Sequence, residues 1–233
     1  MRKILIILFC ALFLCGSLRI AEAALVKTET TQALEWTPIA AQGVLETGTI
    51  NVSGGYDTTL HIDCALTSTT AHTGTEIIVQ IASEASVNDA WTDLARFIGP
   101  VGTAIKVDLG GDAIATATTL IVTNPTTNNL DLLGKFVYLK ETSTIASSEI
   151  VYQTGCSLDA GDTITILNGL THAQTAANSD FYTIDTATDE AVKSYAVTIP
   201  ASASQARVIF NNNYDTTAST VDVRVRVTAM TGI

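Results

Sequence analysis

Positively charged residues are scarce in this sequence, where 12 Lys and Arg stand against 23 Asp and Glu and give a formal net charge of −11. Nucleic acids are held through clustered Lys and Arg on their phosphates, so this balance argues against a nucleic-acid partner. The acidic surface favours solubility and suits divalent cations at carboxylate-lined turns.

Long apolar segments are also lacking, apart from the run Ile4 to Cys15, which is shorter than the roughly 20 residues that cross a bilayer. The basic pair Arg2-Lys3 precedes this run, and the small-x-small sequence Ala21-Glu22-Ala23 follows it. That layout is typical of a secretory signal peptide. We therefore expect residues 1–23 to be removed, no transmembrane segment, and a secreted protein, extracellular or at the cell surface, that begins at Ala24.

Cysteine is rare, and only Cys64 and Cys156 remain after removal of the signal peptide. Export permits a disulfide, so the pair is a candidate bridge. However, Cys64 shares one strand parity with Leu60, Ile62 and Leu66, which fits a buried small hydrophobic side chain equally well. Both interpretations stay open at this stage.

Aromatic residues make up only 6% of the chain and there are four prolines, whereas Thr, Val, Ile and Leu are abundant. Thr and Val branch at Cβ and suit a pleated surface. Apolar and polar residues alternate with period two, most clearly from Val221 to Thr228, which predicts a strand with one buried face. Further strands are expected at Leu34–Trp36, Thr58–Leu66, Glu76–Ala82, Ala104–Leu109, Tyr195–Ile199 and Ala206–Asn211. The sequence predicts an all-β protein, a β-sandwich of jelly-roll or Ig-like type.

The expected strands become shorter after Gly110-Gly111, which predicts a second structural unit. The strands that follow are shorter: Thr118–Val122, Phe136–Glu141, Glu149–Gln153, Thr163–Leu167 and Phe181–Ile184. We expect a small β module at 112–187, inserted into a host sandwich formed by 24–111 and 188–233, since exposed loops tolerate insertions. Only Ala85 to Arg96 is expected to hold a short helical turn.

Several short motifs carry a resemblance to a known class of proteins. In the module they are Ala117–Val122, Gly134–Val137, Ser148–Val151, Asp162–Ile166 and Leu170–Ala173; in the host they are Trp36-Thr37-Pro38, Thr69–Thr75 and the closing Val-Arg alternation. The module resembles one that recurs in bacteriophage tail proteins, and the host is similar to small virion structural proteins of phages and prophages. The resemblance implies a structural role in a virion-like assembly, and the secretory signal is a departure from that family.

Catalytic motifs are missing: no nucleophile elbow, phosphate loop or dinucleotide fingerprint occurs, and His61, His72 and His172 form no metal-ligand pair. We expect no enzyme activity and no cofactor, and we expect these histidines at the surface or in turns. Asp159 and Asp162 flank a glycine turn and are a candidate Ca²⁺ site, although Asp in turns more often bonds its own backbone.

Two functions from different classes fit these observations. The first is a structural subunit that associates with itself into a homo-oligomer or filament. Its N-terminal arm would add to the sheet edge of a neighbour through one parity of side chains: Val26, Thr28, Thr30, Leu34 and Trp36. The second is a secreted adhesin or carbohydrate-binding module. It would use the aromatic side chains Trp91, Tyr56, Tyr182 and Tyr214 as a glycan platform, with Trp36 in the core.

Overall fold

The structure is a computed structural model, and it describes residues 25–54, 57–83, 90–123, 135–157, 162–184, 190–212 and 220–232. The predicted signal peptide lies outside these residues. Within them, no helix is long and apolar enough to span a bilayer.

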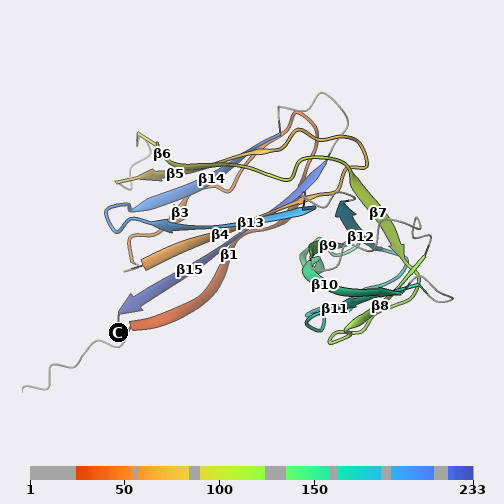
Figure 1. Cartoon of the computed structure of the whole chain (residues 1–233). Coiled ribbons are helices and arrows are strands. Elements are labelled where there is room, and N and C mark those ends of the chain that lie inside the picture. Colours follow the sequence, from red (N-terminus) through yellow and green to blue (C-terminus); the bar gives the residue numbers. More distant parts are fainter. Residues whose placement is uncertain are drawn as a thin grey trace, which may run out of the picture.

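A two-sheet β-sandwich forms the larger part of the molecule (Figure 1). One sheet, here called the β4 sheet, has the order β1 (Leu25–Ile39), β15 (Val221–Gly232), β4 (Asp57–Leu66), β13 (Val192–Ile199). The facing β5 sheet has the order β2 (Val44–Glu46), β14 (Gln205–Asn211), β5 (Glu76–Ala82), β6 (Thr92–Ile98), with β3 (Ile50–Asn51) also pairing β14. The all-β sandwich expected from the period-two patterns is therefore confirmed.

The sandwich core follows from that alternation. Leu60, Ile62 and Cys64 of β4 and Val221, Val223 and Val225 of β15 are fully buried, and they meet Val79 and Phe210 of the facing sheet. The intervening residues of β4 and β15 point to the outer face of the β4 sheet, where they include Asp63 and Arg224. This outer face carries the charged groups of the candidate site.

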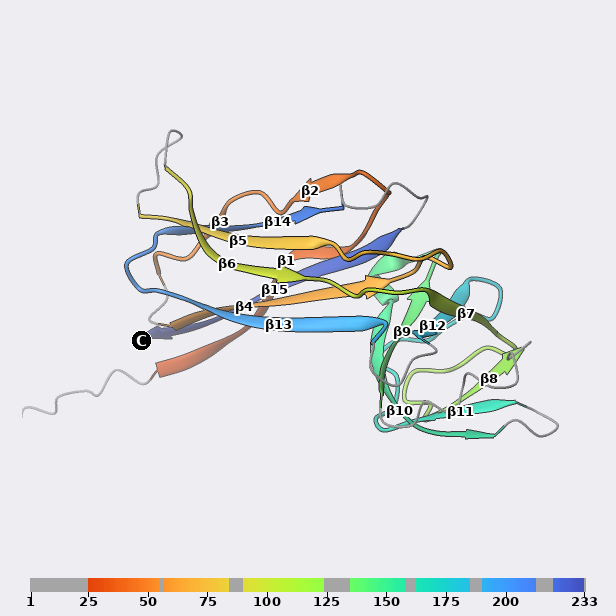
Figure 2. The ribbon, with the colours of Figure 1, turned by 45° about the horizontal axis from the view of Figure 1, so that its top comes forward.

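The second unit is a closed six-stranded barrel at one end of the sandwich (Figures 1 and 2). Its strand order is β10-β11-β8-β7-β12-β9. The elements are β7 (Ala104–Leu109), β8 (Thr119–Thr123), β9 (Lys135–Glu141), the 3₁₀ turn η1 (Ile145–Ser147), β10 (Glu149–Ser157), β11 (Thr163–Ile166) and β12 (Ser179–Ile184). Leu120, Val137, Leu139, Ile164 and Phe181 fill its interior as a separate core.

The chain enters the barrel after β6 and returns to the sandwich at β13. The strands expected between 112 and 187 all lie in this barrel. The barrel also contains β7, which the sequence analysis placed in the host, because β7 pairs with β8 and β12 rather than with a sandwich strand. Period two alone could not reveal which partner this strand takes.

The helical turn expected within Ala85 to Arg96 is wrong for the part that the structure describes, since β6 occupies Thr92–Ile98. A β-bulge opposite Val79 and Gln80 shifts the register of β6. A bulge adds one residue to a strand and so breaks the alternation of apolar and polar residues. The apolar residues Trp91, Leu94, Ala95 and Ile98 therefore stand at the i, i+3, i+4, i+7 spacing that is typical of a helix. Residues 84–89 lie outside the described residues.

The N-terminal arm is part of its own sheet. β1 pairs antiparallel with β15, with Val26 opposite Thr231, Thr28 opposite Ala229 and Leu34 opposite Val225. Three register shifts interrupt this pairing, one of them spanning Thr30 and another Trp36, so the single parity assumed for the arm does not persist. The arm is therefore an edge strand of the sandwich, paired with the chain's own C-terminal strand.

Candidate functional site

The barrel packs on the outer face of the β4 sheet through a buried polar link. Asp222 of β15 is fully buried and accepts a hydrogen bond from the Tyr138 hydroxyl (3.0 Å). The ammonium group of Lys140 lies 2.8 Å from the same carboxylate. Burial raises the pKa of Asp222 above its ordinary value, and Lys140 and Tyr138 only partly oppose this.

Trp36 completes this junction rather than the interior of the sandwich. Its ring lies 4.7 Å from the Tyr138 ring, and the Arg224 guanidinium lies 4.6 Å above its centroid. Trp36 is 1% exposed, so its expected burial is confirmed. The sequence could not show that its partner is the barrel, since Tyr138 lies about 100 residues along the chain.

A charged cluster lies beside the junction on the same outer face. The register places Ser194, Asp63 and Arg224 directly opposite one another on β13, β4 and β15. Asp63 is 2% exposed and accepts hydrogen bonds from Ser194 Oγ (2.7 Å), from Arg224 Nη2 (2.8 Å) and Nε (3.0 Å), and from Arg226 Nη2 (3.2 Å). One buried carboxylate therefore faces two guanidinium groups.

The barrel contributes a second acidic group to this region. Glu149, at the start of β10, accepts hydrogen bonds from the backbone N–H groups of Thr171 (2.8 Å) and His172 (2.6 Å). His172 Nδ1 lies 3.5 Å from the same carboxylate, and the imidazole is 49% exposed. Glu149 thus holds the 171–172 turn against the barrel.

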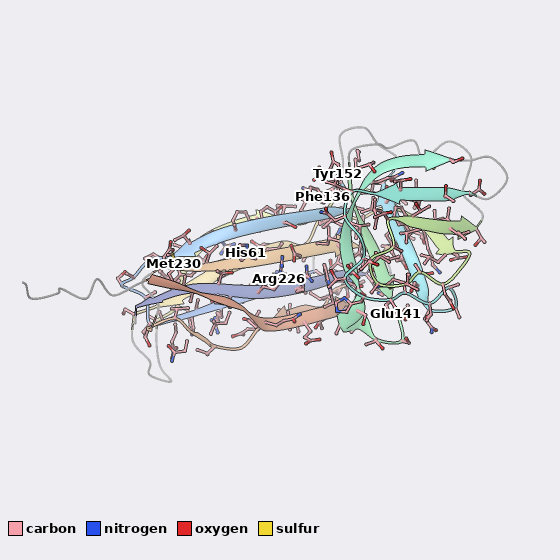
Figure 3. The ribbon with its side chains drawn as sticks, turned by 90° about the horizontal axis from the view of Figure 1, so that it is seen from below. His61, Phe136, Glu141, Tyr152, Arg226 and Met230 are labelled. Atoms are coloured by element: carbon pink, nitrogen blue, oxygen red, sulfur yellow. The ribbon has the colours of Figure 1, made fainter. Side chains whose placement is uncertain are left out.

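These groups line a cleft of about 650 Å³ between the β4 sheet and the barrel. Asp63 and Arg226 contribute from the sheet, and Phe136, Glu149 and His172 from the barrel. Figure 3 shows Arg226 and His61 along the sheet and Phe136 and Tyr152 at the adjoining barrel. Volumes of 300 to 1,000 Å³ at the boundary of two units are typical of small-molecule sites. The sequence analysis did not identify this cleft, although the alternating Arg residues of β15 were a signal.

A further polar cluster belongs to the barrel itself. Glu141 is 3% exposed and accepts hydrogen bonds from Ser143 Oγ (2.7 Å) and Ser179 Oγ (2.8 Å), and from Thr175 (3.3 Å). Burial would raise its pKa, but the hydrogen bonds to the charged form outweigh it and lower the pKa below the ordinary value. The cluster links the end of β9 to the segment before β12.

The candidate disulfide is not formed. Cys64 is fully buried in the sandwich core, while Cys156 lies on β10 opposite Ile164 and packs against the barrel core. The two cysteines therefore belong to separate cores. Burial raises the pKa of the Cys64 thiol, so the alternative role, a small apolar side chain, describes it.

The described residues include only part of the predicted glycan platform and of the predicted Ca²⁺ turn. Tyr182 is 7% exposed and lies within the junction core, and the Arg207 guanidinium covers the Trp91 ring at 4.3 Å. Tyr56, Tyr214 and Asp159 lie outside the described residues. No group of three His, Cys, Asp or Glu that could hold a metal ion occurs among the residues that are described, which include Asp162.

The three histidines occupy different environments. His72 lies in the connection between β4 and β5, as the turn alternative expected, but it is 2% exposed and so not at the surface. It lies 2.8 Å from Asn212 Oδ1, and its Nδ1 accepts the N–H of Gly74 (2.9 Å). His61 is partly buried on the outer face, and His172 lines the cleft. Only His172 therefore belongs to the candidate site.

No family model and no curated protein matches the chain. Among solved structures it has distant similarity to two viral ones. A structure of infectious bursal disease virus Gt strain shows 10% identity and a TM-score of 0.22, over 92% of this chain and 82% of the other. VP17, a capsid protein of bacteriophage P23-77, shows 11% identity and a TM-score of 0.17, over 89% of this chain and 99% of the other. Both TM-scores are far below the level at which two chains share a fold, so neither likeness carries an argument.

Proposed function

We propose that this chain is an exported structural subunit that associates with itself into an extracellular, cell-surface or virion-like assembly. The observation that carries the proposal is an asymmetry of the sandwich. On the side of β13 and β6, side chains cover the backbone groups of the edge strands. On the side of β1, the edge strand is uncovered and lies beside a groove.

The sealed side lies between the edge strands β13 and β6. The Tyr195 hydroxyl donates to the Ile98 carbonyl (2.6 Å), and Lys193 Nζ donates to the Gly99 carbonyl (3.3 Å). The rings of Tyr195 and Phe97 stack at 4.3 Å. These side chains cover backbone groups that an added strand would otherwise use, which is one way in which proteins protect sheet edges.

The open side lies along β1. Among the described residues, β1 pairs only with β15, so its outer backbone edge has no strand beside it. A groove of about 340 Å³ opens next to it. Its apolar lining residues are Ala33, Ile50, Val227 and Ala229, all partly exposed, and Thr47, Thr49 and Asn51 line the rest. An edge and an apolar groove together suit an extended segment of a second copy, with backbone hydrogen bonds to β1 and side chains in the groove. Such a contact is head-to-tail and builds an open filament unless its rotation closes a ring.

The chemistry of the buried carboxylates supports a structural and non-enzymatic role. Asp63, Glu141, Glu149 and Asp222 all accept hydrogen bonds from groups of their own fold. A catalytic acid or base needs access to a reacting group. We therefore propose no reaction and no cofactor for this chain. The scarcity of Lys and Arg leads us to propose no nucleic-acid partner.

Self-association is tested on protein that begins at Ala24. Light scattering and negative-stain microscopy should show oligomers or filaments. Ala229→Glu places a charge in the groove and should abolish them, because an unpaired charge is costly in an apolar contact. Thr198→Glu, at an exposed position of the opposite edge strand β13, is the matched control and should assemble normally. A protein that stays monomeric at high concentration, with and without calcium, would contradict the proposal.

Export is tested separately. Intact-mass analysis of secreted protein should show a chain that begins at Ala24, because cleavage is expected after Ala21-Glu22-Ala23. Exported protein that retains residues 1–23 would refute the signal-peptide assignment while leaving the assembly proposal standing.

A further inference from the structure

We propose that the cleft between the β4 sheet and the barrel binds a carboxylated sugar, of the uronic acid type, with Arg226 holding the carboxylate and Phe136 supporting the ring. This binding function is independent of self-association, since the cleft and the groove beside β1 share no lining residue. It agrees with the carbohydrate-binding alternative from the sequence analysis, but it uses a different site from the aromatic platform expected there.

Arg226 is the cationic group with hydrogen-bonding capacity left for a ligand. Its neighbour Arg224 donates twice to Asp63 and stacks on Trp36, and its side chain is 17% exposed. Arg226 donates to Asp63 from Nη2 alone, at 3.2 Å, and its side chain is 39% exposed. Its Nε is buried and has no hydrogen-bond partner within the described part of the chain. A planar guanidinium with unused donors suits a carboxylate, which it can bind through two parallel hydrogen bonds.

The charges around the cleft favour one negative group rather than several. Asp63 neutralises only one of the two guanidinium groups, so Asp63, Arg224 and Arg226 together keep one positive charge. Glu149 and the exposed Glu190 line the other parts of the cleft and would repel a phosphate or a polyanion. Their oxygens can accept hydrogen bonds from hydroxyl groups instead. A single carboxylate on a hydroxylated body matches this arrangement.

Phe136 supplies the apolar surface that a sugar ring requires. It lies on β9 and is 49% exposed, whereas the other aromatic residues that the structure describes are buried or partly buried. Tyr152 holds its ring edge-on at 5.0 Å, so the platform is positioned before any ligand binds. An aromatic face packs against the C–H face of a sugar, and the cleft of about 650 Å³ has room for one or two sugar units.

The test uses D-glucuronate and D-galacturonate as probes, with glucose, acetate and sulfate for comparison. Calorimetry gives the affinity, and the Arg Nε–H signals in ¹H–¹⁵N spectra report contact with Arg226. The uronates should bind and shift the Arg226 signal, and glucose, acetate and sulfate should bind at least about tenfold more weakly, since a hydrogen bond to a charged group is worth about that factor. The same titrations on Ala229→Glu protein separate this site from self-association.

Variants assign the two roles. Arg226→Gln and Phe136→Ala should each weaken uronate binding by about tenfold or more, and Arg226→Lys, which keeps the charge without the planar fork, should lie between. Arg207→Gln and Ile121→Ala change an arginine and an exposed apolar residue that do not line the cleft, and these variants should bind uronate normally. All variants must keep the cooperative melt of the parent. Absence of uronate binding, equal binding of sulfate, or full binding by Phe136→Ala would each overturn the proposal.

Discussion

At the scale of single residues, two buried carboxylates are stabilised in opposite ways. Asp222 faces one ammonium and one hydroxyl across the junction, and burial raises its pKa. Glu141 accepts hydrogen bonds from several Ser and Thr groups, which lower its pKa. The two acids should therefore make opposite contributions to the pH dependence of stability.

Lys140→Met tests the junction pair. The change leaves the Asp222 charge buried with only Tyr138 beside it, so the free energy of unfolding should fall by about 3 to 5 kcal/mol near neutral pH. The pKa of Asp222 is higher in the native than in the unfolded protein. Its contribution to the free energy of unfolding is therefore fully present below the unfolded pKa and is lost as the pH rises through the native pKa. The destabilisation should hence be smaller at about pH 4 in urea denaturation. The double variant Lys140→Met/Asp222→Asn should recover most of the loss, and a double variant no more stable than Lys140→Met would contradict the pairing.

Glu141→Gln should show the reverse pH dependence. The lowered pKa of Glu141 means that its contribution is present above the unfolded pKa and is lost as the pH falls through the native pKa. The variant should lose roughly 2 kcal/mol at neutral pH and show a flatter decline on acidification. Glu35→Gln, at an exposed position of β1, is the control and should change little. Equal pH profiles for Glu141→Gln and the parent would rule out this role.

At the scale of secondary structure, β1 illustrates how an edge strand is held and limited. It is 15 residues long and pairs with β15 along most of that length, but three register shifts interrupt the ladder. Bulges twist an edge and reduce its capacity for unspecific pairing. The strand is consequently part of the sandwich, and any partner has to add outside it.

Deleting residues 25–32 should lower the melting temperature by several degrees, because these residues pair with the end of β15. A free arm would leave the melting temperature unchanged and remove assembly alone. Replacement of the same residues by Gly and Ser keeps the chain length and should destabilise less than deletion but in the same direction, since the backbone bonds can still form. Circular dichroism melts of the three proteins, together with light scattering, distinguish the two roles.

At the scale of the whole molecule, the barrel is inserted in one loop of the sandwich but is not merely tethered. Tyr138, Tyr182, Ala104 and Ile184 share one buried cluster with the sandwich core. The cleft exists because the barrel is held at a defined position against the β4 sheet. Binding in the cleft should therefore depend on the junction as well as on the lining residues.

Replacing residues 104–184 with a Gly-Ser linker should leave a folded but less stable sandwich. Trp36 then loses the cover of Tyr138, and its fluorescence should shift to longer wavelength. Replacing 112–187 instead keeps β7 without β8 and β12, and an unpaired strand of this kind favours aggregation. Circular dichroism, a thermal melt and fluorescence compare the two. Loss of cooperative unfolding in both would mean that sandwich and barrel form one folding unit.

The sequence alone determined the strands and the faces that they bury. Alternation is a local property, because successive side chains of a strand point to opposite sides, so β4, β5 and β14 could be predicted to within one residue, and β15 over its first eight residues. The same logic failed at the bulges in β1 and β6, where one extra residue reverses the alternation.

Only the tertiary structure decided which strands and side chains are in contact. Whether β1 pairs with its own chain, whether Cys64 reaches Cys156 and which strands close the barrel are questions of partners distant in sequence, and many pairings satisfy the same alternation. The cleft is the extreme case, since Asp63 and Arg226 are 163 residues apart and Phe136 belongs to another unit. Its chemistry arises where two independently patterned surfaces are packed together, and no local periodicity encodes that contact.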